Sequence, residues 1–123
     1  MFILTIQEFK QIAKNKKIAV IGIGVSNIPL IRMLAEFGAE VYAFDRRNKE
    51  QLEETYDELL SLGVKMILGE DYLDKIDNDT YMLFKTPGLR FDVPQLLKAK
   101  ENGTIISSEM ELFLSVALPK SLQ

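Results

Sequence analysis

A glycine-rich turn follows an apolar run near the start of the chain, where residues 17–27 read KIAVIGIGVSN. A buried strand, a glycine turn and a helix N-terminus together bind phosphates in α/β proteins, because main-chain N–H groups and the helix dipole attract an anion. Gly22 lets the strand turn tightly, and Gly24 lets the backbone approach a phosphate. The donors that we expect to bind a phosphate or diphosphate are the main-chain N–H groups of Val25, Ser26 and Asn27.

Asn27 stands where the dinucleotide-binding pattern G-x-G-x-x-G has its third glycine. That glycine allows the helix to pack closely on the strand, whereas asparagine is a favourable helix N-cap. We therefore expect Asn27 to cap the helix and to keep its side chain in the turn. The pattern is weak as a signature of NAD. It suits any phosphate, and it also fits a strand–helix turn that binds nothing.

A charged segment, Asp45, Arg46 and Arg47, follows the next predicted strand. In this fold the end of the second strand reaches the sugar or the base of a nucleotide. An acid there accepts hydrogen bonds from ribose hydroxyls or from a ring N–H, while an arginine binds a phosphate or lies flat on a base. A solvated charged turn is the alternative interpretation.

A third segment, residues 85–89 (KTPGL), follows the fourth predicted strand. It lies across the switch point from the glycine turn, where open α/β sheets bind ligands. Thr86 offers a hydroxyl, and Gly88 offers an unobstructed backbone. Pro87 and Gly88 also fit the two central positions of an ordinary type II turn without a ligand.

Strands and helices that alternate along the whole chain must position these segments. We expect strands at residues 17–22, 40–44, 64–68, 81–85 and 104–106. We expect helices at 5–13, 28–37, 49–62 and 92–103, a short helical turn at 71–76, and a last helix at 108–118. Such alternation indicates a parallel sheet covered on both faces by right-handed crossovers. The predicted fold is α/β, a Rossmann-like doubly wound five-stranded parallel sheet of order 3-2-1-4-5 in one domain.

Capping residues and apolar spacing define the ends and the buried faces of the helices. Asp71 and Asp92 are the expected N-caps of the segments at 71–76 and 92–103, and capping boxes precede the first and last helices. The residues expected to be buried in the helix at 49–62 are Leu52, Tyr56, Leu59 and Leu62.

The composition argues against several classes of function. The 123 residues carry a net charge of -3, which implies no broad basic surface and no nucleic-acid partner. No cysteine or histidine is present, so disulfides, thiol chemistry and the commonest metal ligand are absent. The acidic stretch at 70–79 fits no metal-binding loop, so we expect a solvated loop there and no metal site. Without a membrane-length apolar run or a signal peptide, a cytoplasmic protein is the expectation.

The expected last helix, at 108–118, is apolar around most of its circumference. Such a helix is buried on more than one side. We therefore expect the chain to be a fragment of a longer protein, with this helix partly facing a further domain.

Four motifs in this order resemble a known family. They are Gly22-x-Gly24-x-Ser26, Asp45-x-Arg47, Thr86-Pro87-Gly88 and Ser108-Glu109-x-Glu111-Leu112. Together they resemble the N-terminal domain of the Mur ligases over residues 5–118, most closely the branch that adds D-glutamate. This resemblance implies a cytoplasmic three-domain enzyme of peptidoglycan synthesis that uses ATP to join D-glutamate to UDP-N-acetylmuramoyl-L-alanine.

The resemblance also implies roles for individual residues. The backbone at Val25 and Ser26 would meet the diphosphate of the substrate. Asp45 and Arg46 would hydrogen-bond the uracil, and the residues that would flank the ring are Arg47 and Gly88. Two positions depart from many relatives, because Asn27 replaces a glycine and Arg46 replaces a smaller residue.

The chain lacks the G-x-x-G-K-[ST] phosphate loop that a ligase of this family needs for ATP. We therefore expect ATP and Mg²⁺ to bind in other domains of the parent, with the helix at 108–118 contacting the central ATP-binding domain. The fragment alone is expected to bind substrate and to catalyse nothing.

Two other interpretations remain open. In an NAD(P)-binding module of a dehydrogenase or a regulatory sensor, Asp45 would hold the adenosine ribose, and Arg46 and Arg47 would bind a 2′-phosphate. In an interaction domain that binds no nucleotide, the last helix would be the docking element.

Overall fold

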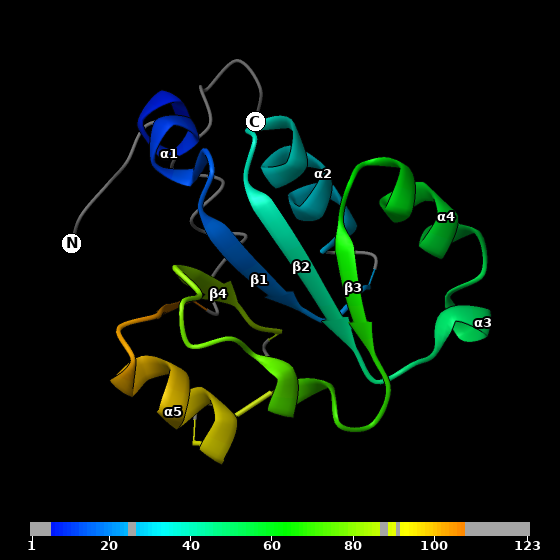
Figure 1. The fold of residues 1–123 in the computed structure, drawn as a ribbon. Helices are drawn as coiled ribbons and strands as arrows, with labels where there is room; N and C mark the ends of the chain where they lie inside the picture. Colours follow the sequence, from blue (N-terminus) through cyan, green and yellow to red (C-terminus); the bar gives the residue numbers. More distant parts are fainter. Residues whose placement is uncertain (1–5, 25–26, 87–88, 91, 108–123) are drawn as a thin grey trace.

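The computed structural model describes residues 6–24, 27–86, 89–90 and 92–107. Within these ranges strands and helices alternate along the chain, as Figure 1 shows. The strands are β1 (Lys17–Ile21), β2 (Glu40–Asp45), β3 (Lys65–Leu68), β4 (Met82–Phe84) and β5 (Ile105–Ser107). The helical elements are α1 (Ile6–Ala13), α2 (Ile28–Glu36), α3 (Lys49–Leu52), α4 (Glu54–Ser61), the 3-10 turn η1 (Tyr72–Lys75) and α5 (Pro94–Glu101).

The five strands form one parallel sheet in the order β3-β2-β1-β4-β5, which confirms the predicted topology. In the central strand, Val20 pairs with Ala43 of β2 on one side and with Phe84 of β4 on the other. Because the strands are parallel, the carboxyl ends of β1, β2 and β4 meet at one edge, which we call the carboxyl edge. The strand order reverses beside β1, so this edge also holds the switch point.

Helical elements cover both faces of the sheet (Figure 1). Side chains of β1 alternate between the two faces: Ile18 and Val20 belong to the core that includes α1, α2 and α4. Ala19 and Ile21 belong to the core that includes α5. Burial on both faces explains why this strand is apolar at successive positions. The ends of all five strands lie within one residue of the predicted ones.

The single helix predicted at 49–62 is wrong, because two helices, α3 and α4, meet at Glu53. Asn48 and Gln51 form a capping box at α3, and Glu53 then adopts a φ of 54° and a ψ of -127°. Residues other than glycine rarely adopt this conformation, which costs about 1–3 kcal/mol. Glutamate favours helices, so residue 53 gave no signal of the break.

Leu62, predicted to be buried, is 41% exposed. The helix ends at Ser61, and Leu62 forms its C-cap. The prediction is confirmed for Leu52 and Leu59, which are buried, while Tyr56 is half-buried against the same core.

Two predicted N-caps are also wrong. Asp71 precedes η1, but its side chain makes no capping hydrogen bond. The N-cap of α5 is Val93, and Asp92 pairs instead with Arg90 at 2.7 Å. Pro94 lies in the first turn of α5, where its missing N–H removes one donor that a cap would satisfy. The two capping boxes predicted at 5–8 and 108–111 and the helix at 108–118 involve residues outside the described ranges.

The acidic stretch at 70–79 has exposed acidic side chains, as predicted. Two of them bind Lys17 at the start of β1: Asp77 and Asp79 each lie 2.9 Å from its Nζ. Hydrogen bonds to Asp77 and Asp79 raise the pKa of Lys17. These ion pairs join the segment before β4 to the first residue of β1, at the edge of the sheet opposite the carboxyl edge.

Within the described ranges, no helix has the length and apolar character needed to cross a bilayer.

Replacing Glu53 with glycine is expected to stabilise the protein. Glycine adopts the conformation of residue 53 without a steric cost, so Glu53→Gly should raise the free energy of unfolding by about 1 kcal/mol. Urea denaturation measures the change. The matched control is Asp57→Gly, which removes the same charge from an exposed position in α4 and should destabilise by about 0.5 kcal/mol. Equal losses in the two variants would contradict the strain at Glu53.

Candidate functional site

The glycine turn after β1 contains one glycine that the fold requires and one that faces open space. Gly22 has a φ of 102°, and a Cβ at this residue would lie 2.7 Å from the Cγ2 atom of Thr86. At Gly24 an added Cβ would meet no atom within 4 Å. Gly22 therefore allows the two loops to touch, whereas Gly24 leaves room beside the backbone for another molecule.

Asn27 holds the glycine turn and does not cap the helix, which corrects the prediction. It occupies the N-cap position of α2, but its side chain makes no capping hydrogen bond. Its Nδ2 atom donates to the carbonyl of Gly22 at 2.8 Å and to that of Ile21 at 3.3 Å. Asn27 is 5% exposed. Asn27 has helical backbone angles, with φ at -94° and ψ at -21°, whereas a capping residue typically has an extended backbone. Its main-chain N–H, which we expected to bind a phosphate, donates to the carbonyl of Gly24 at 3.0 Å.

Asp45, at the end of β2, binds the glycine turn through the main chain of Ile23. The N–H of Ile23 donates to Oδ2 at 2.8 Å. Three donors of Arg47 fill the remaining positions: its main-chain N–H at 2.8 Å and Nε at 3.0 Å donate to Oδ1, and Nη2 donates to Oδ2 at 3.0 Å. A carboxylate has about four acceptor positions. All four are used by the chain itself.

The carboxyl group of Asp45 is buried and ionised. Burial alone would raise its pKa, but hydrogen bonds from the side chain and main chain of Arg47 and from the N–H of Ile23 outweigh burial. The pKa therefore lies below its ordinary value. At neutral pH the group is a fixed negative charge between β2 and the glycine turn.

Arg47 is the more accessible partner of this pair. Its side chain is 45% exposed, compared with 11% for Asp45. Nη2 of Arg47 also donates to the carbonyl of Ile23, so the guanidinium bridges the glycine turn and the end of β2. Arg46 is exposed beside it.

Thr86 brings the loop after β4 to the glycine turn. The N–H of Leu89 donates to the carbonyl of Thr86 at 3.1 Å, and we call the segment whose two ends this bond joins the 86–89 turn. The methyl group of Thr86 occupies the space where Gly22 lacks a side chain. The structure thus joins the predicted segments after β1, β2 and β4 at the carboxyl edge.

Four of the predicted site residues lie outside the described ranges. They are Val25, Ser26, Pro87 and Gly88. Sequence reasoning missed the main chain of Ile23, and it placed Lys85 in the segment at 85–89 without giving its side chain a role. A lysine at the end of an apolar strand was a usable signal for Lys85, because lysine is rarely buried without partners.

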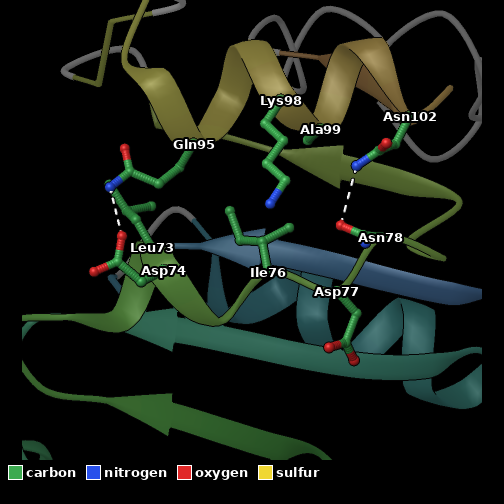
Figure 2. Close-up of a pocket in the computed structure, with 9 residues that line it drawn as sticks. All are labelled: Leu73, Asp74, Ile76, Asp77, Asn78, Gln95, Lys98, Ala99 and Asn102. Atoms are coloured by element: carbon green, nitrogen blue, oxygen red, sulfur yellow. Dashed lines mark hydrogen bonds between the residues drawn. The ribbon is translucent and has the colours of Figure 1, made fainter.

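A polar cavity of about 120 Å³ lies elsewhere, between α5 and the segment that links η1 to β4 (Figure 2). Two hydrogen bonds join its walls: Gln95 donates to Asp74 at 2.7 Å, and Asn102 donates to Asn78 at 3.1 Å. None of the predicted site residues lines it. Its polar side chains therefore hold α5 to this segment, and the cavity is separate from the candidate site.

Solved structures with a similar fold include the A chain of dipicolinate synthase from Bacillus subtilis. Its TM-score is 0.58 at 15% identity, over 86% of this chain and 36% of that chain. A shikimate 5-dehydrogenase from Mycobacterium fortuitum gives a TM-score of 0.51 at 14% identity, over 85% and 48% of the two chains. At such low identity the likeness shows the Rossmann-like fold alone.

Sequence relatives are much closer than these structures. The chain is 50% identical over 111 residues to the UDP-N-acetylmuramoylalanine--D-glutamate ligase of Ruminiclostridium cellulolyticum, and 51% identical over 110 residues to that of Clostridium novyi. The alignments cover 90% and 89% of this chain but only 24% of each relative. The chain therefore spans about a quarter of the length of these relatives.

A family model described as "Mur ligase MurD-like, N-terminal domain" matches residues 16–108, a range that contains every described segment of the candidate site. This match and the relatives that are half identical to the chain confirm the resemblance inferred from the four motifs. The chain belongs to the MurD-like N-terminal domain family of the Mur ligases.

Proposed function

We propose that this chain binds the uridine diphosphate end of UDP-N-acetylmuramoyl-L-alanine, for a parent ligase that joins D-glutamate to this substrate. The observation that carries the proposal is the contact of three loops at the carboxyl edge, with open space beside Gly24. In open α/β sheets this edge is the place where nucleotides bind. Membership of the MurD-like family supports this choice of nucleotide.

The glycine turn supplies the diphosphate site in this proposal. Main-chain N–H groups of Val25 and Ser26 bind the phosphate oxygens, and the N-terminus of α2 adds its positive dipole. Asn27 contributes indirectly, because its amide binds the carbonyls of Ile21 and Gly22 at the start of the turn. Thr86, with Pro87 and Gly88, forms the opposite side of the site.

The uracil site requires Arg47 to release Asp45. The carboxylate has no unused acceptor position, so it accepts an N–H from uracil only after a donor of Arg47 has left. Arg47 is exposed enough to move. The freed guanidinium then lies on one face of the ring, with Gly88 on the other, and Arg46 reaches the polar edge of the base.

In this proposal, the ATP-dependent ligation takes place in other domains of the parent enzyme. We place ATP and Mg²⁺ in further domains, with the segment 108–118 contacting the ATP-binding domain and the parent enzyme in the cytoplasm. We assign ATP binding to other domains because the chain contains no G-x-x-G-K-[ST] run.

Binding of uridine nucleotides tests the proposed function. The ¹⁵N-labelled chain is titrated with UMP, UDP, UDP-N-acetylmuramoyl-L-alanine and NADPH while amide NMR shifts are followed. We expect the uridine ligands, and not NADPH, to shift the amides of Gly24–Asn27, Asp45–Arg47 and Gly88. Shifts caused by NADPH alone would replace this proposal with a redox or sensor module. An absence of shifts with every ligand would also contradict it.

Two glycine variants distinguish a loss of UDP binding from a loss of stability. Gly24→Ala places a methyl group in open space, so it should fold with normal stability and bind UDP about tenfold more weakly. Gly22→Ala combines a positive φ with a clash against Thr86 and should destabilise the chain by about 2 kcal/mol or more. Unchanged UDP affinity in Gly24→Ala would place the diphosphate elsewhere.

Asp45 should make stability depend on pH. Its pKa is lowered in the folded state, so its contribution is complete above the ordinary value near 4 and is lost as the pH falls through the folded value. Asp45→Asn should cost about 2 kcal/mol at pH 7, and the difference from wild type should shrink below about pH 4.

Urea denaturation at several pH values measures this dependence. The control is Asp92→Asn, because Asp92 has an exposed arginine partner and an exposed side chain of its own. It should cost less than about 0.5 kcal/mol at any pH. A difference in unfolding free energy between wild type and Asp45→Asn that stays constant from pH 7 to pH 3 would contradict a stabilising role for the ionised Asp45.

The isolated chain is expected to be inactive as an ATPase and as a ligase, because no phosphate loop is present to bind ATP. Phosphate release is measured with ATP, Mg²⁺, D-glutamate and UDP-N-acetylmuramoyl-L-alanine. Turnover that depends on D-glutamate would show that the chain holds catalytic machinery of its own.

A further inference from the structure

Lys85 is a buried cationic residue at the carboxyl edge of the sheet. It follows β4, is 5% exposed, and its main-chain N–H donates to the carbonyl of Ser107 at 2.9 Å. Burying an ammonium group costs several kcal/mol unless hydrogen bonds compensate. A leucine or methionine would fill such a position at lower cost if packing were the only requirement. The hydrogen bonds of the ammonium group therefore explain the lysine.

The ammonium group of Lys85 binds the turn over 86–89 at two places. Nζ donates to the carbonyl of Thr86 at 3.1 Å and to the carbonyl of Leu89 at 2.5 Å. These carbonyls lie at the two ends of the turn, and the N–H of Leu89 donates to the same carbonyl of Thr86. The side chain and the main chain therefore close one turn together.

The turn that Lys85 closes is the one that touches the glycine turn. The methyl group of Thr86 fills the space beside Gly22, and Leu89 packs against the core beneath α5. A change in the position of Thr86 would open a gap at Gly22. Lys85 thus acts on the glycine turn through Thr86.

We propose that Lys85 is a positioning residue of the nucleotide site, which holds the 86–89 turn against the glycine turn before the ligand binds. This inference rests on the proposed function. A loop held in its binding conformation pays less ordering entropy when the ligand arrives, and this difference appears as affinity. The role needs the donors of Lys85, so a side chain of equal length without an ammonium group cannot perform it.

The experiment compares Lys85→Met with the matched control Lys100→Met, which removes an exposed ammonium group from α5. Hydrogen exchange of the Leu89 amide reports the turn in the free protein, and NMR titration with UDP reports affinity. We expect Lys85→Met to exchange the Leu89 amide about tenfold faster and to bind UDP about tenfold more weakly. Lys100→Met should match wild type in both measurements.

Chemical rescue separates the ammonium group from the bulk of the side chain. The chain has no cysteine, so Lys85→Cys introduces a single thiol. Alkylation in urea with 2-bromoethylamine, followed by refolding, yields an aminoethyl side chain that is close to lysine in length. Alkylation with 1-bromopropane yields a neutral side chain of the same length that has no hydrogen-bond donor. We expect the aminoethyl form alone to restore the protection of the Leu89 amide and the affinity for UDP. If Lys85→Met does not fold, comparison of the two alkylated forms still tests the role of the ammonium group.

The possible outcomes distinguish this inference from the proposed function. Failure of the wild-type chain to bind UDP would refute the proposed function and, with it, a role for Lys85 in binding. Wild-type binding that persists at full affinity in Lys85→Met would refute the inference alone. Faster exchange at Leu89 with unchanged affinity, or equal rescue by the neutral side chain, would also refute it.

Discussion

The carboxylate of Asp45 is the interaction on which the carboxyl edge depends. It lies at the end of β2 and accepts one N–H from the turn after β1 and three donors from Arg47. The bond from Ile23 to this buried charge favours one relative position of the two loops. Removing the carboxylate would leave the N–H of Ile23 without this acceptor and the guanidinium of Arg47 without its anion. The shape of the edge follows from satisfying these groups.

Asn27 and Lys85 extend the same rule along the edge. Each is a buried polar side chain that bonds main-chain carbonyls of a neighbouring turn. Within the described ranges, no buried side-chain nitrogen or oxygen lacks a hydrogen-bond partner. Satisfied buried groups specify one backbone conformation, because any other leaves a costly unpaired donor or acceptor. Asn27 and Lys85 therefore help to fix the main chain of these two turns, and the space beside Gly24 is open.

Much of the fold could be predicted because its signals are local. Apolar runs marked the five strands to within one residue, and their alternation with helices led to the correct strand order. The errors lie where the residue type allows more than one outcome and the folded backbone selects between them. Glu53 breaks a helix that its residue type favours, and Asn27 and Asp92 have cap-forming side chains that found other partners. For the candidate site, the sequence identified the three segments but did not predict the contacts between them.

The sequence by itself determined which segments reach the carboxyl edge, because the phase of each strand and the handedness of each crossover depend on neighbouring residues and on general stereochemistry. It also determined the family, through four motifs spread along the chain. Only the tertiary structure decided which donor meets which acceptor: Asp45 with Ile23, Asn27 with Gly22, and Lys85 with the 86–89 turn. The physical reason is geometry. A hydrogen bond forms within about 3 Å, so even neighbours in sequence such as Asn27 and Gly22 bond only where the folded backbone places them at that distance. Strand pairing does the same for Asp45 and Ile23, which are far apart in sequence.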